Sequence, residues 1–174
     1  MMEFKPHRID FAKEFAKMKN IPEILDNGYD KTPNPYTEKD ALEFIQQEIV
    51  KKPMERFLIY WNNEVAGEIG ITLKEDVFRL NAEIGYFISK NYWGNGLATL
   101  AVGKMTAYTF ANFEVVRIVA GVFDFNKSSM KVLEKNGYYL ESVRKKAVIK
   151  KGKIMDDYIW VKLKDEPAAT NTKK

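Results

Sequence analysis

Two glycines, Gly94 and Gly96, stand between an extended segment and a long apolar stretch with the character of a helix. Glycine lacks a Cβ, so here the backbone can pass close to a ligand. The first amide groups of the helix that follows have no partners inside the helix and point outward. The turn and the helix start therefore predict a seat for a phosphate-bearing anion in residues 94–99. A tight turn with no ligand is the alternative that the turn chemistry alone leaves open.

The turn does not fit the two commonest nucleotide-binding motifs. No Gly-Lys-Ser/Thr follows Gly96, as a phosphate-binding loop of the Walker type requires. The glycine spacing differs from the dinucleotide fingerprint, and the strand before the turn follows a meander and does not open the chain. A protein that binds ATP through this turn is therefore disfavoured.

Periodicity places helices and strands around the turn. Apolar residues recur at helical spacing between Ile9 and Met18, and Thr37 has the sequence of a helix N-cap with Asp40 three residues later. The expected order is a helical N-terminal third, strands at 56–61, 65–73 and 80–88, a helix from 97 to about 111, a strand at 117–123, a helix from 126 to 136, extended segments at 138–144 and 145–150, and a last strand at 158–163.

This order predicts an α/β (α+β) fold with a single domain over residues 1–164. The three middle strands fit an antiparallel meander, and the strand–helix–strand–helix run that follows implies a parallel crossover. We therefore expect a mixed, mostly antiparallel sheet flanked by helices. A length of 174 residues suits one core. Residues 165–174 are small and polar, and we expect a flexible tail there.

The composition excludes several classes of site. The chain has no cysteine, which rules out disulfides, thiolate zinc sites and a cysteine nucleophile. Its one histidine, His7, does not suffice for a histidine metal cluster, so we expect no metal, and we expect His7 at the surface. The net charge of +4 favours a solvated surface over a nucleic-acid groove. No apolar run has the length of a membrane span, so we expect a cytoplasmic protein without a membrane partner.

Three blocks stand in a fixed order along nearly the whole chain: 34–45, 83–86 followed by 92–99, and 126–138. Together they resemble the GNAT superfamily of N-acetyltransferases, and most of all the branch that acetylates the N-termini of ribosomal proteins. Gly152 followed by Asp156 resembles the closing hairpin of that branch. Trp93 stands where the wider superfamily usually has Gln or Arg, and tryptophan is common there in this branch. A core aromatic is the alternative role for Trp93.

The resemblance implies that the chain binds acetyl-CoA as a cosubstrate. It implies that the strands at 83–89 and 117–123 pair at first and then splay apart. The pantetheine arm would enter there and pair, as an added strand would, with the backbone of Phe87, Ile88 and Ser89. The pyrophosphate would be held by the amides of Gly94, Asn95, Gly96, Leu97, Ala98 and Thr99. Asn126 would hydrogen-bond the arm from the other side, and its alternative role is to cap the next helix.

The reaction needs a base for the amine and an acid for the departing thiolate. The resemblance places a catalytic glutamate at Glu83, and a structural salt bridge is the alternative of equal weight. Many superfamily members use a tyrosine acid after the Asn126 block, but the matching stretch here has none. Ser129 is the substitute that we name as acid, with a helix-cap hydroxyl as its alternative. Asp156 and Asp157 follow the hairpin near where an acceptor could enter, and we expect Asp157 to belong to a solvated strand end.

The resemblance thus implies transfer of an acetyl group from acetyl-CoA to a primary amine by direct attack. The acceptor would be a protein N-terminus or a small amine. The alternative is an acyl-CoA-binding sensor or interaction module that keeps the fold without turnover. Tyr60, Trp61 and Trp160 suit either a core or a homodimer interface, so the sequence leaves the oligomeric state open.

Overall fold

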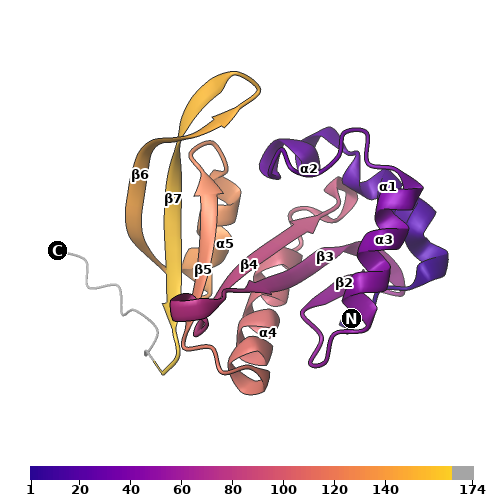
Figure 1. Ribbon diagram of the computed structural model, residues 1–174, viewed down its shortest axis with the longest axis horizontal. Helices are drawn as coiled ribbons and strands as arrows, with labels where there is room; N and C mark the ends of the chain where they lie inside the picture. Colours follow the sequence, from indigo (N-terminus) through magenta and orange to yellow (C-terminus); the bar gives the residue numbers. More distant parts are fainter. Residues whose placement is uncertain (166–174) are drawn as a thin grey trace. The chain divides into compact units, whose positions relative to one another are not determined.

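The computed structural model describes residues 1–165, and the tail expected at 165–174 lies outside them except for Asp165. The strands are β1 (Met2–Lys5), β2 (Arg56–Trp61), β3 (Glu64–Leu73), β4 (Asn81–Ile88), β5 (Arg117–Phe123), β6 (Tyr139–Lys150) and β7 (Lys153–Leu163) (Figure 1). The helices are α1 (Ala12–Lys19), α2 (Pro22–Asn27), α3 (Glu38–Ile49), α4 (Leu97–Asn112) and α5 (Lys127–Lys135), with short 3-10 helices η1 (Ile9–Phe11), η2 (Asp76–Phe78) and η3 (Lys90–Tyr92).

The strands form one sheet in the order β1-β2-β3-β4-β5-β7-β6. The pairs β1–β2, β2–β3, β5–β7 and β6–β7 are antiparallel. β4 and β5 run parallel, and the helix α4 connects them. Their pairing joins residues 81–83 to 117–119 and stops there within the described chain, although both strands continue. The predicted α/β fold, with its mixed sheet and a parallel pair that ends early, is confirmed.

Two compact units share the chain. Unit 1 consists of residues 1–70 and 86–97, and unit 2 consists of residues 71–85 and the chain from 98 onward. The chain therefore passes from one unit to the other inside β3, inside β4 and at the start of α4. None of the described helices is both long enough and apolar enough to cross a membrane.

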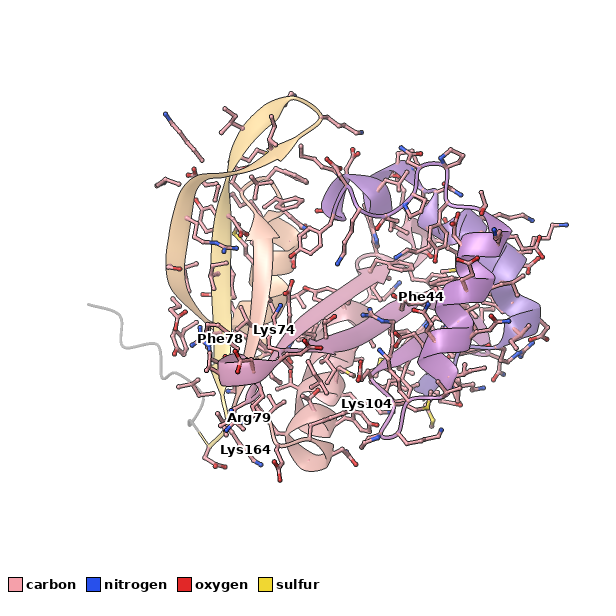
Figure 2. The ribbon with its side chains drawn as sticks, viewed as in Figure 1. Phe44, Lys74, Phe78, Arg79, Lys104 and Lys164 are labelled. Carbon is pink, nitrogen blue, oxygen red and sulfur yellow. The ribbon has the colours of Figure 1, made fainter. Side chains whose placement is uncertain are left out.

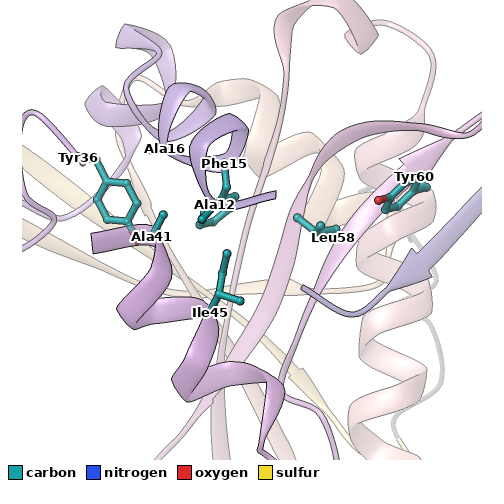
Figure 3. Close-up of a cluster of buried hydrophobic side chains, with 8 residues drawn as sticks. All are labelled: Ala12, Phe15, Ala16, Tyr36, Ala41, Ile45, Leu58 and Tyr60. Atoms are coloured by element: carbon teal, nitrogen blue, oxygen red, sulfur yellow. The ribbon is translucent and has the colours of Figure 1, made fainter. Parts of the chain in front are cut away.

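A cluster of buried apolar side chains forms the core of unit 1. Figure 3 shows Phe15 of α1 beside Ile45 of α3, where both are fully buried. Phe15 also stacks on Phe44, with 5.7 Å between the ring centroids. The members of the cluster are Ala12, Phe15, Ala16, Tyr36, Ala41, Ile45, Leu58 and Tyr60. Tyr60 therefore belongs to the core, which was one of its two expected roles.

Helix α3 begins as its sequence predicts. Thr37 Oγ1 accepts the amide hydrogen of Asp40 at 3.2 Å, and Asp40 Oδ2 accepts the amide hydrogen of Thr37 at 2.7 Å. This reciprocal capping box satisfies two amide donors at the helix start. It fixes the direction in which the helix leaves the loop before it.

Unit 2 has its own core, made by apolar residues of α4, α5, β5 and β7. Met105, Ile118, Leu133 and Val161 are fully buried there. Tyr138 is buried as well, and its hydroxyl lies 2.7 Å from that of Thr106 of α4. A buried hydroxyl pair of this kind satisfies both polar groups inside the core.

A buried group of charged residues in unit 1 was not predicted. His7 is buried, not at the surface as expected, and its ring meets Phe15 and Phe44 edge-on. Its Nε2 lies 3.3 Å from Oε2 of the buried Glu68 on β3. Arg56 Nη1 of β2 lies 3.4 Å from the other carboxylate oxygen of Glu68. An imidazole can be buried when a carboxylate faces it, because the pair replaces the lost water.

The pKa of the Glu68 carboxyl reflects two opposed effects. Burial raises it, but contact with His7 and the positive charges of Arg56 and Lys19 outweigh burial and lower the pKa from 4.5 to about 2. The ionised form therefore stabilises the folded state.

β3 and β4 approach closely at a glycine. A Cβ built on Gly67 would stand 2.1 Å from the carbonyl oxygen of Phe87, far inside van der Waals contact. The amide of Ser89 donates to the carbonyl of Ala66 at 2.8 Å in the same region. The final residues of β4 are therefore held against β3 only because position 67 has no side chain.

We predict that Gly67→Ala lowers the free energy of unfolding by about 1 to 3 kcal/mol, the usual cost of forcing a methyl group into filled space. Gly85→Ala is the matched control on β4, because a Cβ there meets no atom within 4 Å. Urea denaturation of both variants measures the difference. Equal losses for the two variants would contradict the account.

We also predict an acid-sensitive contribution from Glu68. Its pKa is depressed in the folded state, so its contribution to stability is complete above pH 4.5 and declines as the pH falls toward 2. The free energy of unfolding of the wild type should therefore fall more steeply over this range than that of Glu68→Gln. Denaturation curves at several pH values test this, and parallel pH profiles would show that Glu68 does not contribute.

Candidate cofactor and active site

Both glycines of the turn have a left-handed backbone. Gly94 has φ of +80° and Gly96 has φ of +70°, a region that side-chain-bearing residues rarely adopt. A Cβ built on either glycine meets no atom within 4 Å, and residues 94–96 are exposed. Helix α4 starts directly afterwards at Leu97. The turn thus offers accessible backbone next to a helix N-terminus, as an anion seat requires.

The six residues assigned to this seat differ in their surroundings. Leu97 is buried and anchors the start of α4, whereas Ala98 and Thr99 are half-buried in its first turn. The carbonyl of Thr99 accepts a hydrogen bond from Asn136 Nδ2 at 3.1 Å. This bond involves the carbonyl of Thr99 and not its amide. The side chains of the seat are small or directed elsewhere, so its chemistry is that of the backbone.

Side chains in the turn and just before it form hydrogen bonds. Asn95 Nδ2 donates to the carbonyl of Tyr92 at 3.2 Å. The Tyr92 hydroxyl donates to Glu64 Oε2 at 2.7 Å. Trp93 Nε1 donates to the carbonyl of Ile88 at 2.7 Å, although the residue as a whole is 53% exposed. Trp93 is thus partly anchored and is not the core aromatic of its alternative role.

The end of β4 separates the three residues assigned to the pantetheine arm. Ser89 uses both of its backbone groups, because its amide donates to Ala66 and its carbonyl accepts from Tyr92 at 2.9 Å. The carbonyl of Phe87 faces Gly67 of β3. Backbone groups alternate sides along a strand, so those of Ile88 face away from β3. Of the three residues, Ile88 is the one placed to pair with an added chain.

Glu83 lies on β4 in an ion pair. Lys74, which follows β3 (Figure 2), places its Nζ 2.5 Å from Glu83 Oε2. The side chain of Glu83 is 28% exposed, so water reaches it. Glu83 and Val119 also form the last matched pair of the parallel ladder. The salt bridge that was the alternative to a catalytic role is therefore present.

Asn126 and Ser129 occupy the start of α5. Asn126 Oδ1 accepts the amide hydrogen of Ser129 at 3.1 Å, so Asn126 caps the helix. The side chains of both residues are half-buried. The cap commits the oxygen of the Asn126 amide and orients its Nδ2 group.

The two aspartates of β7 have different surroundings. Asp157 is 5% exposed and forms an ion pair with Arg144 of β6, so the expectation of a solvated strand end was wrong. Asp156 binds the Nζ of Lys145 and the amide of Lys146, each at 2.8 Å. Those contacts lower the pKa of the Asp156 carboxyl. Asp156 thereby holds an irregularity of β6, where the register shifts between Arg144 and Val148.

A charge pairing across strands of this kind has no signal in the sequence, because the partners are more than ten residues apart. The described residues include no group of His, Asp or Glu that could hold a metal ion. Unit 1 thus carries the glycine turn and the strand end at Ile88, and unit 2 carries the paired carboxylate Glu83.

Comparison with known proteins gives one consistent result. Residues 2–139 match the family described as Acetyltransferase (GNAT) domain. The chain is 31% identical over 140 residues to the uncharacterized N-acetyltransferase p20 of Bacillus licheniformis, covering 77% of this chain and 78% of that protein.

Solved structures with the same fold share less sequence. The ribosomal L7/L12 alpha-N-protein acetyltransferase RimL, in complex with coenzyme A, superposes with a TM-score of 0.81 at 18% identity over 93% of each chain. A chimera of the spermidine N-acetyltransferase SpeG from Vibrio cholerae and hSSAT has a TM-score of 0.78 at 15% identity, covering 93% of this chain and 95% of that one.

Proposed function

We propose that this chain, which belongs to the GNAT family of acetyltransferases, transfers an acetyl group from acetyl-CoA to a primary amine by direct attack. The observation that carries the proposal is the turn at Gly94 and Gly96. Its positive φ values and open surroundings present amides ahead of α4. Helix starts of this kind bind phosphates because their amides are unpaired and their dipole is positive.

The remaining contacts with the cosubstrate follow from the geometry of each residue. The amides of residues 94–99 hold the pyrophosphate. The outward backbone of Ile88 pairs with the pantetheine arm, whereas both backbone groups of Ser89 are engaged within the chain. Asn126, which caps α5 through its Oδ1, hydrogen-bonds the arm from the other side.

In the chemical step one bond forms and one breaks, while the amine loses a proton and the sulfur receives a hydrogen-bond donor. The neutral amine attacks the thioester carbonyl, a C–N bond forms, and the C–S bond breaks as the thiolate leaves. Glu83 accepts the proton that the amine nitrogen loses, directly or through a water molecule, and the Ser129 hydroxyl donates to the departing sulfur. The Nζ of Lys74 lies 2.5 Å from Oε2 of the same carboxylate.

The acceptor is a protein N-terminus or a small amine. Support comes from two of the solved structures with this fold, an acetyltransferase of the ribosomal protein L7/L12 and a chimera of a spermidine N-acetyltransferase. The second candidate is an acyl-CoA-binding module without turnover, and the ion pair that occupies Glu83 is the observation in its favour. Release of free CoA from acetyl-CoA with peptides and polyamines as acceptors decides between them.

We predict that Gly96→Ala weakens CoA binding about tenfold, because αL backbone costs a side-chain-bearing residue roughly 1 to 2 kcal/mol and the seat must distort to relieve it. Gly152→Ala, in the turn between β6 and β7, is the matched control. Its φ is +74° and a Cβ there also meets no atom within 4 Å. Calorimetric titration with CoA compares the two, and equal affinities would remove the seat from residues 94–96.

For the base, we predict that Glu83→Gln lowers kcat by about 10²- to 10⁴-fold, the usual contribution of a general base, with little change in the KM for acetyl-CoA. Lys74→Met is the matched control, since it removes the same ion pair and leaves the carboxylate. It should retain most of the wild-type kcat. If both variants lose activity and stability equally, the salt bridge is structural and Glu83 is not the base.

A further inference from the structure

Trp93 links two parts of the proposed cofactor site within unit 1. It directly precedes Gly94, and its indole N–H donates to the carbonyl of Ile88 at 2.7 Å. Ile88 is the last residue of β4 and the residue that we assign to the pantetheine arm. A single side-chain hydrogen bond therefore joins the strand end to the turn. The inference drawn from it rests on the proposed function.

The turn needs such support because of its composition. Glycine has more backbone freedom to lose than any other residue, so a turn with two glycines is costly to hold in one conformation. Nothing packs against Gly94 or Gly96 where side chains would stand. The order of the turn must therefore come from the residues that precede and follow it.

Three side chains tie the preceding segment to unit 1, and they differ in exposure. Lys90 Nζ reaches Glu23 Oε1 of α2 at 3.0 Å, and the Tyr92 hydroxyl reaches Glu64, but both contacts are exposed to water. The bond from Trp93 is partly buried. Water competes less well for a buried bond, so the indole contact is the one that contributes most to the order of the turn.

We propose that Trp93 is a positioning residue for the cosubstrate: its indole N–H holds the turn at residues 94–96 in the conformation that receives the pyrophosphate. It does so without touching the reacting atoms. The same bond occupies the Ile88 carbonyl, which leaves the Ile88 amide as the group that pairs with the arm. Preorganisation of this kind raises affinity because less conformational freedom is lost on binding.

The test separates the N–H group from the ring. Trp93→Phe keeps an aromatic ring without the donor, and replacing Trp93 with 3-benzothienylalanine keeps nearly the full shape with sulfur in place of N–H. We expect each to raise the Kd for CoA and the KM for acetyl-CoA about five- to tenfold, which is the contribution of one net hydrogen bond. The kcat, the KM for the amine and the thermal unfolding midpoint should stay close to those of the wild type.

Tyr92→Phe is the matched control, because it removes a neighbouring exposed hydrogen bond of the same segment. Its Kd for CoA should change less than about twofold, since water replaces the lost partner. Wild-type affinity in the benzothienylalanine protein would overturn the role of the N–H. An equal rise in both KM values, or a lower unfolding midpoint, would show a general structural role instead. If the wild type itself does not bind CoA, the proposed function fails, and with it the role of Trp93.

Discussion

The close approach of β3 and β4 at Gly67 is the constraint on which the candidate site depends. The Phe87 carbonyl occupies the space that a side chain at position 67 would need. This contact sets where β4 ends and which of its backbone groups face β3. Ile88, Trp93 and the glycine turn follow Phe87 within nine residues, so an error at this strand pair would displace all of them. The glycine turn thus depends on a contact that lies outside it.

Glu68 and Glu83 both form ion pairs, but their side chains differ in burial. Glu68 is enclosed by His7, Arg56 and aromatic rings, and its charge is balanced on several sides. Glu83 pairs with Lys74, and its side chain is 28% exposed to water. Burial, more than the presence of a cation, distinguishes the two carboxylates.

The sequence was informative where a function depends on local backbone. The positive φ of Gly94 and Gly96, the Thr37 capping box and the Asn126 cap all follow from residues within a few positions of one another. The fold class could be predicted for the same reason, because periodicity and turn residues determine the order of helices and strands. These features needed no knowledge of distant contacts.

The sequence failed where the outcome depended on partners far along the chain. His7 was expected at the surface, yet Glu68, 61 positions later, makes its burial tolerable. Asp157 was expected to be solvated, yet it is buried beside Arg144 across a strand pair. The difference between Ile88 and its neighbours Phe87 and Ser89 likewise depends on strand alternation, which becomes visible only when the pairing of β3 and β4 is known.

The way the chain is shared between the two units has a consequence for biosynthesis. Unit 1 takes its first segment from residues 1–70 and its second from residues 86–97, with a stretch of unit 2 in between. A nascent chain leaving the ribosome therefore holds the helices of unit 1 before it holds the strand end and the glycine turn that complete it. The apolar surface of residues 1–70 is completed only after residue 97 has been synthesised. Neither unit is one continuous segment of the chain, so neither can be expressed by itself as a single stretch.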